Sequence, residues 1–557
     1  MNLQNLTFSI LLFCIFVCGL SNSLLSQDGK NVPYKNKYHI ILKNKKGSTF
    51  NPYEYFDVKA IERRLNNSVN LYDSTDFPVS QIYVNLIRQE VDSIIFISRW
   101  FNFISVSAYP LQILNLQYYK FIDKIVSVPP LQGKLSAFQC VRDINSISGL
   151  YSVDSVLFYN SYNTSLSPEN KHLLFNQINI LDADVFQNNN IDGRAKRIAI
   201  FDGGFPGVNN NPVFDNIRKE NRIIKTWNFA NNKEFVYSWN THGTMVMSCI
   251  AGRINDINIG LATGAEFLLA RTEVDSEPFI EEVNWLAAAE WADKNGADII
   301  NSSLGYNFQR YFPEDMDGKT SFVAKAANLA ARKGMLVVNA AGNEGTLEWS
   351  KIITPADADS VLTVGGIDPQ TGFHISFSSF GPSSDKRLKP NVSAFGQVIA
   401  AGKKGLSKVE GTSFAAPLIA GFAACAWQLK SSLTNMQLFS EIQKSGSLYP
   451  YFDYAHGYGV PKASYFFSSS QLDSTSNLFQ IIKTNYGLLT IKFNTPIQVN
   501  DLLYFNLQDS KGFLLKYYIL SVESQEFSLP VSFYNKADFL NIHFRNQTLK
   551  YKLNTTQ

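Results

Sequence analysis

Four polar residues in this 557-residue chain have the side chains that acyl transfer by a serine requires. They are Asp202 in I-A-I-F-D-G-G-F, His242 in N-T-H-G-T-M, Asn343 in V-N-A-A-G-N-E-G and Ser413 in G-T-S-F-A-A-P. Such a reaction needs a nucleophilic hydroxyl, a base that takes its proton, a carboxylate that orients the base, and a donor for the oxyanion. The four residues supply one group of each kind, so they predict a nucleophilic serine if the fold brings them together.

Each of these residues also has a simpler interpretation when its segment is taken alone. Ser413 precedes an apolar run and could be the N-cap of a buried helix. Asp202 and Asn343 stand beside glycines and could be turn residues. Of the six histidines in the chain, only His242 combines a following Gly-Thr with the start of an apolar helix. The choice between chemistry and local structure therefore depends on the elements that position the four side chains.

Alternating strands and helices are predicted for the part of the chain that carries these residues. Short apolar runs typical of buried strands occur at residues 197–201, 265–270, 297–301, 335–339 and 361–364. Helical patterns cover 279–294 and 321–333 and are followed by Gly296 and Gly334. This alternation indicates a doubly wound α/β fold with a parallel sheet that is covered on both faces. Because reactive groups in such sheets collect at the carboxyl ends of strands, we expect the four residues to meet there.

The segment from about 170 to 468 resembles the subtilase family of serine peptidases. The resemblance rests on the four motifs above, on I-N-S-S-L-G, and on F-S-S-F-G-P and K-P-N-V ahead of the serine. The order Asp, His, Ser is also that of subtilisin-type proteases. The resemblance implies that Ser413 is the nucleophile, His242 the general base and Asp202 its orienting carboxylate, with Asn343 and the Ser413 backbone N–H as the oxyanion hole. Gly203 stands where relatives usually have Thr or Ser, a change that could loosen the loop.

Two further motifs resemble the substrate-binding walls of the family. The segment similar to an edge that pairs with an extended peptide consists of Ser302, Ser303, Leu304 and Gly305. The segment similar to the opposite wall of the primary specificity pocket consists of Ala340, Ala341 and Gly342. The alternative is that both are small residues needed for close packing in an α/β core.

The flanking segments are expected to be separate domains. Residues 1–26 look like a secretory signal peptide, although no Lys or Arg precedes Lys30; a lipoprotein signal ending at Cys18 is the weaker alternative. Residues 27–135 resemble a subtilase propeptide, an α+β unit that assists folding and blocks the cleft, and 136–169 form a polar linker. Short β runs predict a C-terminal β-sandwich over 475–557. It weakly resembles a sorting domain of the type IX secretion system, and a plain accessory sandwich is the alternative.

Composition limits the other classes of function. A net charge of +3 from 50 basic and 47 acidic residues gives no reason to expect a nucleic-acid partner. No stretch after the N-terminal run is expected to be long and apolar enough to span a membrane. Cys140, Cys249 and Cys425 remain after the signal and are expected to be small buried residues. No cofactor is required; Asp315 and Asp317 could bind structural calcium, but a solvated acidic turn is favoured and no metal is assigned.

Together these features predict a secreted serine endopeptidase that is made as a zymogen. Its expected partners are a protein or peptide substrate, its own propeptide as an intramolecular inhibitor, and secretion machinery for the C-terminal domain. The competing hypothesis is a catalytically silent surface protein that binds through that domain. A fluorophosphonate probe separates the two, because only an activated Ser413 reacts with it at a useful rate.

Overall fold

The computed structural model describes residues 35–128, 163–274, 278–307, 310–467, 477–483, 488–534 and 536–553. The predicted signal peptide, Cys140 and most of the predicted linker lie outside these residues. Contacts between Cα atoms divide the chain into two units. The first contains residues 1–49 and 77–132, and the second contains residues 50–76 and 133–557.

The first unit is a four-stranded antiparallel sheet with two helices. The strands pair in the order β2-β3-β1-β4, with bounds β1 Asn36–Leu42, β2 Ser93–Ser98, β3 Phe103–Ala108 and β4 Ile122–Val128. Helices α4 (Gln81–Glu90) and α5 (Pro110–Leu116) supply Val84, Ile87 and Leu116 to the apolar core. This sheet with its two helices agrees with the α+β unit predicted for this part of the sequence.

The second unit is built on a seven-stranded parallel sheet with the order β13-β12-β11-β10-β5-β9-β6. Its strands are β5 Arg197–Asp202, β6 Ile223–Asn228, β9 Glu266–Arg271, β10 Ile299–Ser302, β11 Leu336–Ala340, β12 Val361–Ile367 and β13 Val392–Phe395. All residues of β5, β10, β11, β12 and β13 are buried. This confirms the predicted doubly wound α/β architecture, because only a parallel sheet covered on both faces buries whole strands.

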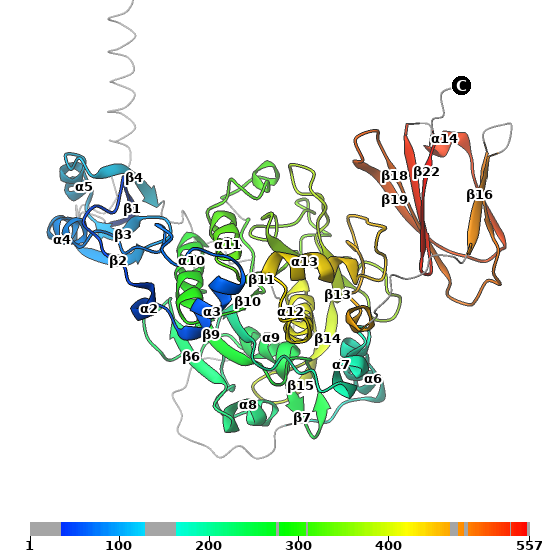
Figure 1. The fold of residues 1–557 in the computed structure, drawn as a ribbon, viewed down its shortest axis with the longest axis horizontal. Helices are drawn as coiled ribbons and strands as arrows, with labels where there is room; N and C mark the ends of the chain where they lie inside the picture. Colours follow the sequence, from blue (N-terminus) through cyan, green and yellow to red (C-terminus); the bar gives the residue numbers. More distant parts are fainter. Residues whose placement is uncertain are drawn as a thin grey trace, which may run out of the picture. The chain divides into compact units, whose positions relative to one another are not determined.

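Two pairs of helices cover this sheet (Figure 1). α9 (His242–Ala251) and α12 (Thr412–Leu429) contact each other and share one apolar core with Ile198 and Ile200 of β5. α10 (Pro278–Lys294) and α11 (Phe322–Arg332) form the other pair, and Trp285 of α10 lies edge-on to Phe201, with ring centroids 5.3 Å apart. Successive strand residues point to opposite faces, so the contacts of Ile200 and Phe201 place the two helix pairs on opposite sides.

The remaining elements of the second unit are short. The hairpin β14 (Gln397–Ala401) and β15 (Leu406–Glu410) leads directly into α12. The other helices and strands around the sheet are α2 Pro52–Tyr55, α3 Val58–Asn66, α6 Pro168–Asn179, α7 Ala183–Asn188, α8 Asp215–Lys219, β7 Arg253–Ile254, β8 Ile257–Asn258 and α13 Asn435–Lys444. Short 3-10 turns lie at Pro212–Phe214, Pro313–Asp315 and Ala463–Phe466.

The C-terminal part of the second unit consists of antiparallel strands, as predicted. One sheet contains β16 Phe479–Lys483, β17 Leu489–Phe493 and β20 Glu526–Leu529. The other contains β18 Leu502–Gln508, β19 Leu514–Ser521, β21 Phe539–Phe544 and β22 Gln547–Lys552, and a helical turn, α14, spans Val531–Tyr534. Side chains of both sheets share one core, which includes Ile491, Phe505 and Phe544.

One expectation about membrane segments is wrong. By length and composition α12 could cross a membrane, whereas no stretch after the N-terminal run was expected to be long and apolar enough. Inside the fold 89% of this helix is buried, so its apolar residues form the centre of the protein core. Cys425 of α12 and Cys249 of α9 are buried free thiols, as predicted for both.

Candidate active site

Asp202 and His242 meet at the carboxyl end of β5. Asp202 is the last residue of that strand and is fully buried, and His242 is the first residue of α9. The Nδ1 atom of His242 lies 2.9 Å from both Oδ1 and Oδ2 of Asp202. Oδ1 also accepts a hydrogen bond of 2.7 Å from the backbone N–H of Gly203. The carboxylate is therefore held on one side by the backbone, and it selects the ring tautomer with its proton on Nδ1.

The electrostatic environment favours the charged form of His242. Burial lowers the pKa of the imidazole, but the carboxylates of Asp202 and Glu273 raise it, and the net shift is above the ordinary value of 6.5. The ring is 11% exposed, so one edge still reaches solvent. A base with these neighbours can accept a proton and hold it as an ion pair with Asp202.

Ser413 lies in the first turn of α12, beside His242. The ring centroids of Phe414 and His242 are 5.4 Å apart. The Ser413 hydroxyl donates to the carbonyl oxygen of Ser303 at 3.2 Å, and the Ser303 hydroxyl donates back to the Ser413 carbonyl at 2.8 Å. The Nε2 atom of His242 has no hydrogen-bond partner among the residues that the structure describes. The residue next to Ser413 therefore contacts His242, but the Ser413 hydroxyl is bonded to Ser303 and not to the imidazole.

The helix-cap interpretation of Ser413 does not agree with the geometry. The N-cap residue of α12 is Gly411, which has a φ of 140° and no side chain to bond the first turn. Ser413 is already inside the helix, and its hydroxyl donates to a different segment. A residue with a side chain would be strained at that φ, which explains the glycine in front of the Thr-Ser pair.

Asn343 follows β11 and is fixed against the start of α12. Its Oδ1 atom accepts hydrogen bonds from the backbone N–H of Thr412 at 2.9 Å and from the Thr412 hydroxyl at 3.0 Å. Its Nδ2 atom lies 3.6 Å from the point where a Cβ on Gly411 would stand. The acceptor end of the amide is thus occupied by Thr412, and the donor end lies next to the helix N-terminus. This N-terminus carries the partial positive charge of the helix dipole.

The first predicted wall segment, 302–305, begins at the last residue of β10. The second, 340–342, begins at the last residue of β11. Gly305 and Gly342 face the same side chain, because a Cβ on either glycine would lie 2.1 Å and 3.0 Å from atoms of Ile353. The carbonyl of Leu304 accepts from Asn339 at 3.0 Å, and Ala341 N donates to Val364 O. Ser302 points to the face of the sheet that α10 covers, where its hydroxyl accepts a hydrogen bond of 3.0 Å from the ring N–H of Trp285. Ser303 is the member of this set that touches Ser413.

The loop after Asp202 is closely packed in spite of its glycines. A Cβ on Gly203 would lie 3.0 Å from the Trp239 ring, and a Cβ on Gly204 would lie 2.3 Å from the Ser238 carbonyl oxygen. The guanidinium of Arg271 also packs over the Trp239 ring, 4.3 Å from its centre. Trp239 therefore packs against Gly203 and takes part of the space that a hydroxyl side chain would need there.

One acidic residue of this site, Glu273, was not predicted from the sequence. The backbone N–H of Thr272 donates to the Asp202 carbonyl, which places Glu273 next to the end of β5. Its Oε1 atom accepts from the hydroxyls of Tyr306 and Thr272, each at 3.1 Å. Burial and the nearby Asp202 raise the pKa of Glu273 to about 7. A signal was available, because R-T-E-V directly follows a predicted strand at the edge where functional groups collect.

The acidic turn considered for calcium uses its carboxylates locally. Asp317 accepts from the backbone N–H groups of Lys319 and Thr320, each at 2.7 Å, and Asp315 accepts from Phe312 N at 2.9 Å. Within the described residues no group of three or more His, Cys, Asp or Glu side chains is arranged to hold a metal ion.

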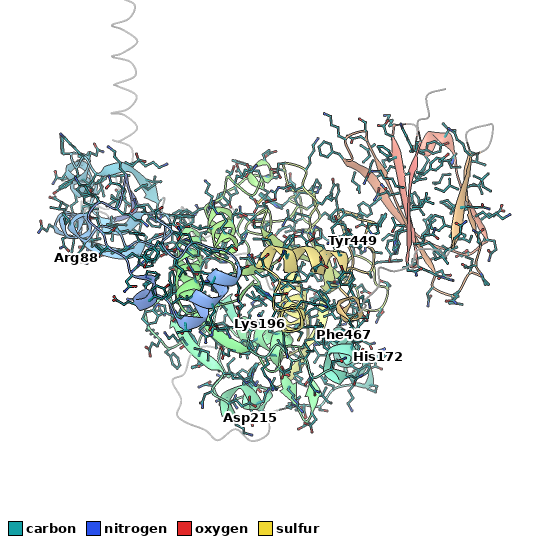
Figure 2. The ribbon with its side chains drawn as sticks, in the orientation of Figure 1. Arg88, His172, Lys196, Asp215, Tyr449 and Phe467 are labelled. Atoms are coloured by element: carbon teal, nitrogen blue, oxygen red, sulfur yellow. The ribbon has the colours of Figure 1, made fainter. Side chains whose placement is uncertain are left out.

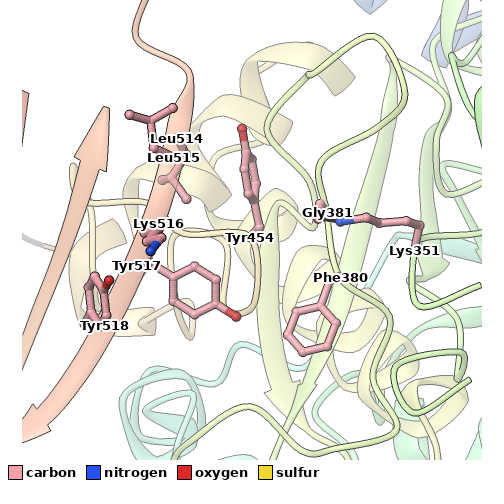
Figure 3. A pocket seen from close by; sticks show the side chains of 9 residues that line it. All are labelled: Lys351, Phe380, Gly381, Tyr454, Leu514, Leu515, Lys516, Tyr517 and Tyr518. Carbon is pink, nitrogen blue, oxygen red and sulfur yellow. Dashed lines mark hydrogen bonds between the residues drawn. The ribbon is translucent and has the colours of Figure 1, made fainter. Parts of the chain in front are cut away.

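A separate pocket lies where the β-sandwich meets the α/β part of the second unit (Figure 3). It is lined by Lys351, Phe380, Gly381, Tyr454 and residues 514–518 of β19. The Lys351 ammonium donates to the Gly381 carbonyl at 2.9 Å. None of the four candidate catalytic residues lines this pocket, so it is distinct from the site at the strand ends.

Comparison with known proteins agrees with the α/β fold of the second unit. Residues 157–459 match the Subtilase family, and residues 37–139 match the peptidase S8 propeptide domain of Bacteroidota. Subtilisin BL of Lederbergia lenta is 29% identical over 272 residues, which are 48% of this chain and 90% of that protein. A thermostable alkaline protease of Halalkalibacterium halodurans is 29% identical over 273 residues, 48% of this chain and 67% of that protein.

Among solved structures, MycP1 from Mycobacterium smegmatis is 22% identical, with a TM-score of 0.44 over 54% of this chain and 85% of that chain. The sequence matches define the class as subtilisin-like serine peptidases, which are hydrolases. The chain belongs to the subtilase family and carries a propeptide domain of the Bacteroidota type.

Proposed function

We propose that the chain is a secreted serine endopeptidase, made as a zymogen, that cleaves peptide bonds through an acyl-enzyme on Ser413. The observation that carries this proposal is the buried Asp202–His242 pair, with Nδ1 2.9 Å from both carboxylate oxygens, beside a serine in the first turn of α12. A silent binding protein would have no need of a buried carboxylate aimed at a histidine. That alternative is therefore not favoured.

In the proposed reaction, His242 Nε2 takes the hydroxyl proton while Ser413 Oγ attacks the substrate carbonyl carbon. Because Asp202 accepts the Nδ1 proton, the neutral ring has its lone pair on Nε2, and the imidazolium that forms is stabilised by the carboxylate. The Ser413 hydroxyl must first rotate away from Ser303 O, since catalytic hydrogen bonds often form only when substrate is bound. His242 then donates its proton to the leaving amine, and water hydrolyses the ester by the same route.

The oxyanion of the tetrahedral intermediate is assigned to Asn343 Nδ2 and the Ser413 backbone N–H. Support comes from the Thr412 hydrogen bonds, which hold the acceptor end of the Asn343 amide and so fix its orientation before substrate arrives. A preorganised donor stabilises charge that exists only in the transition state. We assign the walls of the substrate cleft to residues 303–305 and 340–342, in which Gly305 and Gly342 both pack against Ile353. Ser302 is left out of this assignment, because its hydroxyl bonds Trp285 on the other face of the sheet.

The partners of the enzyme follow from its domains. The substrate is a protein or peptide, and the propeptide domain is an intramolecular inhibitor until it is removed. The apolar N-terminal run supports export, and the C-terminal sandwich is assigned to sorting through secretion machinery, with an accessory role as the alternative. No cofactor is required for the reaction, and a structural calcium ion is not assigned.

The decisive test uses a fluorophosphonate probe, which reacts with activated serines. Once freed of its propeptide, the purified chain should be labelled once, at Ser413, and should hydrolyse peptides, whereas Ser413→Ala should do neither and should remain folded. Turnover by Ser413→Ala at the wild-type rate would refute the nucleophile. A folded wild-type chain, free of its propeptide, that is neither labelled nor active would favour the silent binding protein.

A further inference from the structure

Residues 50–76 lie within the matched propeptide domain, yet they pack with the peptidase unit. This segment, called the arm here, contains α2 and α3, and α3 lies beside α10 in Figure 1. Two consecutive arginines of α3, Arg63 and Arg64, are 3% and 0% exposed. Arginine is almost never buried to this extent unless its charge is fully paired. The arm must therefore have charged partners inside the second unit.

Those partners form a row of alternating charges shared between the arm and the peptidase. Arg63 and Arg64 of the arm both pair with Asp293 of α10, and the Arg64 Nη2 to Asp293 Oδ2 distance is 2.5 Å. Arg64 also pairs with Asp76 at the end of the arm, at 2.7 and 3.1 Å. Lys333 of the peptidase completes the row, with its ammonium 2.8 Å from Asp76. All these side chains are 2% exposed or less. Because water cannot reach them, each charge is stabilised by the opposite charges beside it.

The arm also bonds backbone groups at the ends of two peptidase helices. Arg63 donates to the carbonyl oxygens of Ala297 and of Lys333, the C-cap residue of α11. Carbonyl groups at helix C-termini lack intrahelical partners and carry partial negative charge, so a guanidinium is well matched to them. The Asn67 side chain accepts from the backbone N–H of Asn435 at 2.7 Å, and Asp57 N donates to Lys294 O at 2.9 Å.

Two glycines of the peptidase make room for this contact. Gly296 and Gly334 both have positive φ, and a Cβ on them would lie 2.9 Å from Lys59 Cβ and 3.0 Å from Asn67 Cβ. They stand just before β10 and β11, at the amino-terminal edge of the sheet. Asp202 stands at the carboxyl end of its strand and Asn343 follows the end of another, at the opposite edge. The arm and the candidate active site therefore occupy opposite edges of one parallel sheet.

We propose that the arm is a docking segment that keeps the propeptide bound to the peptidase after the chain is cut between them, at a site remote from Ser413. The chain enters the arm from the first unit at residue 50 and returns to it after residue 76, so a cut downstream leaves the first unit attached to the arm. Release of the propeptide then requires the buried row of charges to separate. Because these charges are excluded from water, the complex should resist high salt.

The test uses the full chain with Ser413→Ala and a recognition site for a sequence-specific protease inserted between residues 145 and 146. After cutting, both pieces should elute together from a sizing column at physiological and at high salt. Arg64→Ala should weaken their association by roughly 10²- to 10³-fold, since it leaves Asp293 and Asp76 buried with unpaired charge. Arg88→Ala is the matched control, because Arg88 is an exposed arginine of α4 in the first unit (Figure 2).

A second variant, Asp293→Asn, makes the test independent of any folding defect in the propeptide. It changes one atom on the peptidase side and should weaken the association in the same direction as Arg64→Ala. Far-ultraviolet circular dichroism of each uncut chain establishes that it is folded. Separation of the Ser413→Ala pieces immediately after cutting would overturn the proposal. So would equal association of Asp293→Asn and Arg88→Ala. Because the readout is binding in an inactive chain, neither result depends on the proposed peptidase activity.

Discussion

Replacing Asp202 by Asn tests the centre of the proposed mechanism with one atom. The Oδ1 atom of Asp202 accepts the Gly203 N–H at 2.7 Å, so the oxygen of the new amide should keep that position. The NH₂ group then takes the place of Oδ2, 2.9 Å from His242 Nδ1, and donates to it. An imidazole that accepts at Nδ1 carries its proton on Nε2. It can no longer take the proton of Ser413.

The expected loss in kcat for Asp202→Asn is about 10⁴, the effect of the same change in another Ser-His-Asp protease, which corresponds to about 5.4 kcal/mol of barrier. KM should change little, because the carboxylate is buried behind the histidine. The direction of the pKa shift adds a second readout. Asp202 raises the pKa of His242, so its removal should move the acid limb of kcat/KM to lower pH.

The assay is peptide hydrolysis as a function of pH, with active sites counted by fluorophosphonate burst labelling of the wild type. Asp256→Asn is the matched control, since the Asp256 side chain is 92% exposed and its ion-pair partner is Arg253. A folded Asp202→Asn enzyme that loses less than about tenfold in kcat would refute the tautomer argument, because the wrong tautomer is the reason for the loss.

Three further predictions concern the surroundings of this pair. Asn343→Ala should lower kcat by about 10²–10³, the range known for a subtilisin, with KM nearly unchanged; a loss below about tenfold would mean that other donors hold the oxyanion. Glu273→Gln should move the acid limb of kcat/KM to lower pH, because Glu273 raises the pKa of His242, and an unchanged or upward-shifted limb would contradict this. A chain ending near Ser470 should hydrolyse peptides at near-normal kcat/KM, since the sandwich supplies no residue to the site, although the Phe452 carbonyl loses its 2.7 Å hydrogen bond from Asn506. In the native host this chain should remain in the periplasm, and equal export of the full-length and shortened forms on fractionation would remove the sorting role.

Much of the fold could be predicted from local patterns. Buried parallel strands appear as short apolar runs, and Gly296 and Gly334 end their helices at positive φ as their positions suggested. The motifs around Asp202, His242, Asn343 and Ser413 were sufficient for the α/β architecture and the family. This is because a parallel sheet brings the carboxyl ends of its strands to one edge, so residues distant in sequence gather there without further information.

Tertiary structure alone decided the contacts that join segments far apart in the chain. The reciprocal hydrogen bonds of Ser413 and Ser303, the position of Trp239 over Gly203, and the approach of Glu273 to Asp202 involve residues whose own segments give no sign of their partners. The same holds for α3, whose Arg63 and Arg64 are of a residue type that is usually exposed to water. Only the fold shows them buried against Asp293, because a charge is stable away from water wherever three-dimensional packing supplies its counter-charge, and periodicity carries no record of that partner.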